Sequence, residues 1–315
     1  MKSFLKKLRY DIGGFFIGIA EFIIPKIPLK ITNTIMYMIY CPLYPVVYLI
    51  PDIRKIVIPN IDIVFGSDLT RRERRKFIKS VFWNLSKTFP DLIYYLNPRN
   101  HQKIIENCPI SGIEHLESAL KKGKGAILLS AHLSNFVLMI VRLTMTGIPF
   151  NVVLKDPSNE TLKGVYKRYQ EICGIERIDA DKGFSATKDI LRALKNNEIV
   201  IIVADERKKR DGIIVPFFGR DALTAPGPAI LVLRSGAPIV PAFIHVVEDS
   251  KFDIEIFPPI EPELTGDKEK DIYNISLIMN EVIEKQIRRY PDQWAWTNPR
   301  WKGAGRHGTR HERTK

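Results

Sequence analysis

Gly125-Ala-Ile-Leu-Leu-Ser130 and Glu198-Ile-Val-Ile-Ile-Val-Ala204 are two short runs that are apolar almost throughout. Such runs are typical of strands buried on both faces of a parallel sheet. An amphipathic stretch with Ile190, Leu191 and Leu194 precedes the second run and predicts a helix packed on that sheet.

More strands and helices are predicted on both sides of these two runs. The expected strands are 150–154, 213–218, 238–246 and 252–257, and the expected helices are 229–233 and 268–289. Strands that alternate with helices predict an α/β fold with a mostly parallel central sheet flanked by helices.

Polar residues follow directly after both buried runs. His132 comes two residues after the first run, and Asp205 comes immediately after the second. Ligands of open α/β sheets bind at the carboxyl ends of the strands, where a histidine can act as a general base. A histidine that caps the next helix or satisfies a buried carbonyl is the alternative, and the pattern alone leaves both open.

Three further segments offer polar groups near strand ends. Lys155 and Asn159 can bind an anionic or carbonyl group, or can simply form a turn with a helix cap. The backbone after Gly219, where Thr224 can cap a helix, can form an anion or oxyanion site. The run from Glu206 to Arg210 can form a salt-bridged loop.

The first residues differ in character from the rest. Residues 31–50 carry no charge and are long enough to span a bilayer, although Pro42 and Pro45 interrupt them. We predict that residues 1–58 form a retained membrane anchor, shallow or hairpin-like, with its basic start on the cytoplasmic side. A signal peptide and a pair of core helices are the alternatives.

Thr70 and Glu73 form a capping-box pattern that opens a basic helix.

Composition restricts the partners and the chemistry. The net charge is +13, which favours an anionic partner such as a membrane, an acidic protein or nucleic acid. Three scattered cysteines indicate no zinc site and no disulfide framework, and no P-loop, HExxH or GxSxG motif is present. We expect one main domain over 59–302 and a basic disordered tail over 303–315.

Four blocks in this order resemble the lipid A biosynthesis acyltransferase family, which also has branches that acylate other glycolipids. The blocks are Gly112–Leu116 running to Gly123–Phe136, then Val153–Lys155 with Asn159, then Asp205 with 215–229 and 235–241, and finally Glu284–Arg288 with Pro291–Trp296 and Arg300–Lys302. The resemblance spans nearly the whole chain before the tail.

The resemblance implies direct acyl transfer from a thioester to a lipid hydroxyl. The family pattern is a histidine, four residues, and then an acid that orients the histidine. His132 matches the base, but Val137 stands at the acid position. Three hypotheses follow: Asp205 or Glu206 replaces the acid, His132 works slowly against a backbone carbonyl, or the protein only binds lipid.

The resemblance also implies the binding partners. Lys155 stands where the family usually has arginine and would hold a phosphate, Arg300 would contact the acceptor headgroup, and the matching blocks place Asn135, Asn159, Gly219 and Thr224 at the substrate. The implied donor is an acyl carrier protein or acyl-CoA, held by the basic residues 207–210, and the acceptor is a glycolipid at the cytoplasmic face of the inner membrane. No cofactor or metal is expected. A nucleic-acid binder is motivated by charge alone, without a binding motif.

Overall fold

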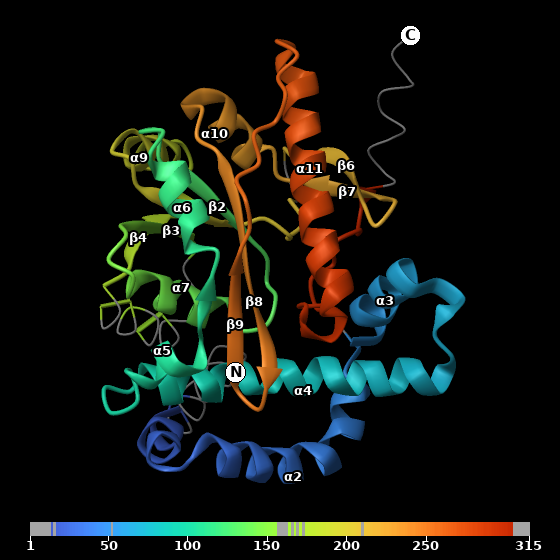
Figure 1. Ribbon diagram of the computed structural model, residues 1–315. Helices are drawn as coiled ribbons and strands as arrows, with labels where there is room; N and C mark the ends of the chain where they lie inside the picture. Colours follow the sequence, from blue (N-terminus) through green and yellow to red (C-terminus); the bar gives the residue numbers. More distant parts are fainter. Residues whose placement is uncertain are drawn as a thin grey trace, which may run out of the picture.

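The computed structural model describes residues 14, 17–51, 53–155, 163–164, 167, 170–171, 174–208 and 211–304. Its centre is a seven-stranded sheet with the strand order β1-β9-β8-β2-β5-β3-β4 (Figure 1). The strands are β1 (Ile110–Ser111), β2 (Ala126–Ser130), β3 (Phe150–Leu154), β4 (Glu176–Asp179), β5 (Ile199–Val203), β8 (Ile239–Glu248) and β9 (Lys251–Ile256).

Most strand pairs in this sheet are parallel, as predicted. Among the described residues of this sheet, β8 and β9 are the one antiparallel pair, joined by a hairpin near one end of the strand order. The predicted strand 213–218 does form, as β6 (Ile213–Phe217), but it lies outside the central sheet. It pairs with β7 (Arg220–Thr224) in a separate two-stranded hairpin.

Helices cover both faces of the sheet, because the strands are apolar on both sides. Ile127 and Leu129 of β2 pack into one cluster, while Ala126 and Leu128 pack into the other. The first cluster contains α9 (Phe184–Lys195), α10 (Gly227–Ser235) and α11 (Lys268–Arg289), and the second contains α5 (Lys103–Asn107), α6 (Ile113–Leu120) and α7 (Phe136–Thr144). This alternation is the expected period of two along a strand.

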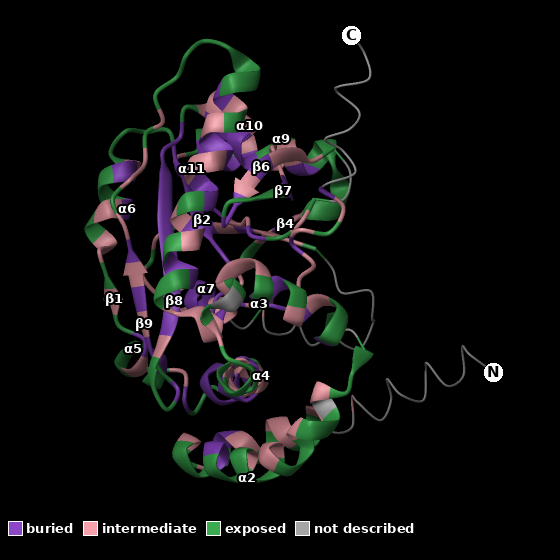
Figure 2. Ribbon diagram, turned by 90° about the vertical axis from the view of Figure 1, so that its right-hand side faces the viewer, coloured by how far each residue is buried: buried purple, intermediate pink, exposed green. Residues whose placement is uncertain are grey.

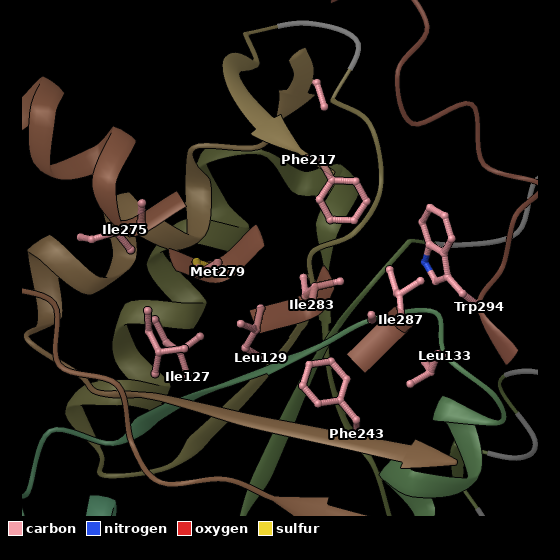
Figure 3. Packing of buried hydrophobic residues seen from close by; sticks show 14 of the residues in the cluster. Ile127, Leu129, Leu133, Phe217, Phe243, Ile275, Met279, Ile283, Ile287 and Trp294 are labelled. Atoms are coloured by element: carbon pink, nitrogen blue, oxygen red, sulfur yellow. The ribbon is translucent and has the colours of Figure 1, made fainter. Parts of the chain in front are cut away.

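Helix α11 supplies a continuous apolar stripe to the first cluster. Ile275, Met279, Ile283 and Ile287 recur every four residues and point at the sheet, as Figure 3 shows. Residues at this spacing share one face of a helix. The predicted bounds of this helix, 268–289, agree with the structure.

Two helices at one end of the molecule carry the N-terminal part of the chain (Figures 1 and 2). Helix α2 (Leu29–Tyr48) packs against α4 (Arg71–Leu96), with the Tyr40 hydroxyl donating to the Lys79 carbonyl at 2.7 Å. Between α2 and α4 in the sequence come a π-helical segment (Ile53–Val57), α3 (Ile58–Phe65) and a 3₁₀ turn (Gly66–Asp68). Another 3₁₀ turn (Ile24–Lys26) precedes α2. The predicted capping box of Thr70 and Glu73 begins α4.

The predicted N-terminal membrane anchor is not supported as a spanning segment. Within the described residues, no helix is both long enough and apolar enough to cross a bilayer. Helix α2 has the length, but its Thr–Asn start, its two prolines and its tyrosines lower its hydropathy. Residues 1–13 of the expected anchor and residues 305–315 of the expected tail lie outside the described part of the chain.

Replacing Ile283 with alanine tests the role of the α11 stripe. The side chain is fully buried, so we expect Ile283→Ala to lower the free energy of unfolding by about 2–5 kcal/mol. The exposed neighbour Lys285 offers a matched control, because Lys285→Ala should change stability by no more than about 0.5 kcal/mol. Denaturant titration measures both, and equal effects would argue against the stripe as a stability determinant.

Candidate active site

The parallel pairing of β2 and β5 places the two sequence-predicted groups side by side. Their registers run Ala126 opposite Ile199 through Ser130 opposite Val203, so both strands end at the same level. The Ala204 amide then donates to the Ser130 carbonyl at 3.0 Å, which extends the pairing by one step. The next residues along each chain are therefore brought together at the carboxyl edge of the sheet.

His132 and Asp205 form a hydrogen-bonded pair at this edge. Nδ1 of His132 lies 2.8 Å from Oδ1 of Asp205, and the His132 amide donates to the same oxygen at 3.1 Å. Asp205 is 1% exposed, whereas the His132 side chain is 29% exposed. The carboxylate thus fixes the tautomer with hydrogen on Nδ1 and leaves Nε2 to accept a proton.

The segment after α11 holds this pair in place. The Trp294 indole N–H donates to the second oxygen of Asp205, Oδ2, at 2.7 Å. The Ala295 amide donates to the His132 carbonyl at 2.9 Å, and the Ser134 amide donates to the Gln293 carbonyl at 2.7 Å. Both carboxylate oxygens are therefore satisfied, and the loop that carries the histidine cannot move independently of this segment.

The charges of the pair stabilise each other. Burial disfavours the imidazolium, but the Asp205 charge and its hydrogen bond, with a smaller contribution from Glu206, raise the pKa of His132 above its ordinary value. Burial likewise opposes the carboxylate, but the His132 charge and the hydrogen bonds from His132 and Trp294 hold the pKa of Asp205 below its usual range. The site is thus built to carry a charged imidazolium–carboxylate state.

A pocket opens beside His132. Its cavity volume is about 30 Å³, or about 510 Å³ with the open space in front of it included, and it lies between α4 and the segment after α11. Val81, Leu85, Phe252 and Trp296 are among its apolar lining residues. Its lining runs along α4 from Val81 to Asp91, ten residues that correspond to about 15 Å of helix. The cavity would have to widen to hold a long apolar ligand.

Known proteins resemble this chain over most of its length. The family model of bacterial lipid A biosynthesis acyltransferases matches residues 1–303. The phosphatidylinositol mannoside acyltransferase of Mycolicibacterium smegmatis is 27% identical over 66% of this chain and 67% of its own. The lipid A biosynthesis lauroyltransferase of Escherichia coli is 26% identical over 79% of this chain and 78% of its own.

This chain belongs to the bacterial lipid A biosynthesis acyltransferase family. The matched region includes His132, Asp205 and the pocket, so the site described above lies within the family's own domain. The relatives are named as acyltransferases of lipid A or of phosphatidylinositol mannoside.

Asn135 of the family's first block has a positioning role in this structure. It is 2% exposed and lines the pocket. Its side-chain oxygen caps α7 by accepting from the Leu138 amide at 3.3 Å, and its Nδ2 donates to the Thr88 carbonyl of α4 at 3.0 Å. Asn135 thereby ties the histidine loop to the helix that forms one side of the pocket.

Lys155 and Gly219 are not among the residues that line the His132 pocket. Lys155 is exposed at the end of β3 and forms an ion pair with Asp181 at 2.8 Å. Gly219 lies at the exposed turn between β6 and β7, with a positive φ of 68°. Asn159 lies outside the described residues, as do two of the four predicted donor-binding bases, 209 and 210.

Arg300, predicted to contact a headgroup, and Thr224, predicted to contribute to a binding site, are both buried in this structure and bonded to other protein groups. Arg300 is fully buried and donates to the Leu223 carbonyl, the Thr224 hydroxyl and the Asn280 side chain. Thr224 ends β7 rather than capping a helix, and its hydroxyl accepts the Arg300 hydrogen bond. Both residues fasten the β6–β7 hairpin to α11 and to the C-terminal segment.

Val137 and Trp294 show what the motif pattern missed. Val137 is the second residue of α7, and Asp205 occupies the Nδ1 side of His132 instead of an acid from that helix. Trp294 belongs to the last block and carries no motif signal of its own there, yet it binds the Asp205 carboxylate. Asn60 belongs to the same support, because its Nδ2 donates to the Trp296 and Asn298 carbonyls. An amide or indole far away in the sequence gives no local signal for such a role.

Replacing Asp205 with asparagine tests the electrostatics of the pair. Asparagine removes the charge that opposes the burial penalty, so we expect the pKa of His132 to fall in Asp205→Asn relative to the parent. The imidazole would then stay neutral to lower pH. NMR titration of the histidine ring signals from about pH 5 to 8 measures this, with His132→Gln assigning the signal. Glu206→Gln should give a smaller decrease, and an unchanged pKa in Asp205→Asn would contradict the pairing.

Proposed function

We propose that this protein transfers a fatty acyl chain from an acyl thioester to a hydroxyl group of a glycolipid. The hydrogen bond between His132 Nδ1 and Asp205 Oδ1 carries the proposal, because it leaves Nε2 as a base at the mouth of an apolar pocket. Family membership supports an acyl group as the moiety transferred. The pocket's apolar lining suits a fatty acyl chain.

The reaction needs no covalent enzyme intermediate. The acceptor hydroxyl gives its proton to His132 Nε2 as its oxygen attacks the thioester carbonyl carbon. Asp205 stabilises the imidazolium that forms, and Trp294 keeps the carboxylate oriented. The tetrahedral intermediate collapses by breaking the carbon–sulfur bond, and the imidazolium returns the proton to the departing thiolate. The products are an ester and a free thiol.

The donor that we propose is acyl carrier protein or acyl-CoA. Arg207 and Lys208 follow directly after Asp205 and Glu206, so their basic side chains lie in the loop next to the catalytic pair. Phosphate groups and acidic proteins are attracted to such residues. The acceptor that we propose is a glycolipid, in keeping with the relatives' names.

We also propose that α2 lies in the surface of the inner membrane at its cytoplasmic face. Its outer side exposes a row of apolar residues that nothing in the described chain covers: Ile31, Ile35, Met38, Ile39, Leu43 and Val46. The start of the neighbouring α4 carries Arg71, Arg72 and Arg75, which are exposed and can bind anionic headgroups. An amphipathic helix beside a basic cluster is typical of interfacial attachment.

A lipid-binding protein with impaired catalysis is the second candidate, favoured by Val137 at the family's acid position. Such a protein would hold the acyl chain and the acceptor without joining them. Asp205 makes the hydrogen bond to His132 that the missing acid would make, and we therefore rank catalysis first.

Product formation separates the two candidates. The parent protein, given an acyl carrier thioester or acyl-CoA with a panel of glycolipid acceptors, should yield an acylated lipid detectable by mass spectrometry. His132→Ala should slow the reaction by about 10²–10⁴-fold, and Asp205→Asn by up to about 10⁴-fold. His115→Ala, a histidine of α6 outside the pocket, should react like the parent. Bound lipid with no product from any variant would favour the lipid-binding candidate.

Vesicle binding tests the role of α2. Ile39→Glu combined with Leu43→Glu places two charges on its apolar row, and we expect at least a roughly tenfold loss of binding to anionic vesicles. Leu264→Glu combined with Tyr273→Glu makes the same changes at exposed apolar residues in and before α11, and binding should persist. Co-sedimentation measures both, and equal binding by the two double variants would rule out α2 as the attachment surface.

A further inference from the structure

The polar groups in the His132 pocket fall into two kinds. Most of them are already hydrogen-bonded within the protein. Asn84 donates to the Asp292 carbonyl, Thr88 bonds the Asn84 carbonyl, and Gln293 bonds both backbone groups of Val246. Such groups have little capacity left for a ligand.

Lys87 and Ser134 are the exceptions. Lys87 is 5% exposed and lines the pocket, but no ion pair or hydrogen bond joins its ammonium to another described residue. Its recorded contacts are the Trp83 ring, whose centroid lies 6.0 Å from Nζ, and an electrostatic interaction with Asp91. The Ser134 hydroxyl is also buried without a hydrogen-bond partner in the described chain. An unpaired buried hydroxyl such as that of Ser134 is costly, which indicates that it binds something absent from the free protein. The Lys87 ammonium lies in the same pocket.

Both groups are held close to the catalytic histidine. Ser134 is two residues after His132, and its backbone adopts a positive φ of 50°, fixed by its amide's bond to the Gln293 carbonyl. Lys87 precedes Thr88, whose carbonyl accepts from Asn135 at 3.0 Å. This bond joins the Lys87 turn of α4 to the loop that carries His132. The two donors and the base therefore line the same pocket.

We propose that the Lys87 ammonium and the Ser134 hydroxyl bind the carbonyl oxygen of the acyl thioester and stabilise its negative charge during transfer. This proposal rests on the acyl-transfer function above. As the acceptor oxygen bonds to the carbonyl carbon, the π electrons of the carbonyl move onto its oxygen, and the two donors bind that oxyanion. The electrons return to re-form the carbonyl as the carbon–sulfur bond breaks. His132 moves the proton, and Lys87 and Ser134 hold the charge.

A transient oxyanion fits these groups better than a permanent phosphate. The pocket is buried and mostly apolar, so a hydrated phosphate would lose its water to enter it. The Asp91 carboxylate, which accepts from the Ser250 hydroxyl at 2.6 Å, also lines the pocket and would repel a lasting negative charge. A single ammonium in a water-excluded site is most effective where charge develops only in the transition state.

Lys87→Met and Ser134→Ala test the proposal, with acyl transfer and thioester hydrolysis both measured. Loss of one oxyanion donor typically lowers kcat by about 10²–10³-fold. We expect Lys87→Met to lower kcat by about 10²–10³-fold for every acceptor, and to lower the rate of thioester hydrolysis without acceptor by a similar factor. The KM for the acceptor should stay within about threefold of the parent value. Lys87→Arg should recover part of the rate, and Ser134→Ala should lose about tenfold. Lys285→Met makes the same change at an exposed position of α11 and should behave like the parent.

Infrared difference spectroscopy provides a readout that does not depend on turnover. Palmitoyl-CoA labelled with ¹³C at its carbonyl should show a lower carbonyl stretching frequency on binding to the parent, and a smaller decrease on binding to Lys87→Met or Ser134→Ala. Equal frequencies would overturn the proposal. So would an unchanged kcat with a raised KM confined to phosphate-bearing acceptors, which would assign Lys87 to a headgroup phosphate instead.

The same experiments separate this proposal from the acyl-transfer function. If the parent binds the thioester and its carbonyl stretching frequency falls but no ester forms, the transfer function fails while the carbonyl site stands. Thermal melting checks that each variant is folded. If Lys87→Met is not folded, Lys87→Arg and Ser134→Ala test the proposal in its place.

Discussion

A buried carboxylate is the constraint on which the rest of this structure depends. Asp205 is almost entirely removed from water, so its charge must be compensated within the protein. The compensation comes from His132, through its ring and its amide, and from the indole of Trp294. These donors belong to distant parts of the chain, and the requirement to satisfy one carboxylate therefore couples the sheet, the histidine loop and the C-terminal segment into one site.

Much of the fold could be predicted because burial leaves a direct mark on sequence. The continuous apolar runs of β2 and β5 and the four-residue spacing in α11 identified those elements with bounds close to the observed ones. The pairing of His132 with Asp205 was also accessible in part, because both follow parallel strands and such strands end at the same edge. Their adjacency in the sheet order was the missing information, and the observed pairing of β2 with β5 provides it.

The parts that were missed depend on long-range hydrogen bonds. Arg300 was expected at a headgroup because a charged residue in a shared motif suggests a ligand. Its donors instead meet the Leu223 carbonyl, Thr224 and Asn280 in the interior, where burial lowers the pKa of the guanidinium to about 10. Trp294 and Asn60 are ordinary residues in their local context, and only the folded chain shows which carbonyls and carboxylates they reach. Polar residues that hold a site together look the same in sequence as polar residues that bind a substrate.

Val137 illustrates why the position of an acid in a motif matters less than its place in space. An orienting carboxylate needs only to reach Nδ1 of the histidine, to be held rigidly and to remain ionised. Asp205 meets these three conditions from the neighbouring strand: the distance is 2.8 Å, both oxygens are hydrogen-bonded, and its pKa is held below the usual range. An acid at position 137 that also reached this ring would add a second negative charge, which would raise the pKa of His132 further and leave less of it as the free base at neutral pH. Valine at that position is therefore compatible with a working base, provided that the Asp205 carboxylate stays buried and paired.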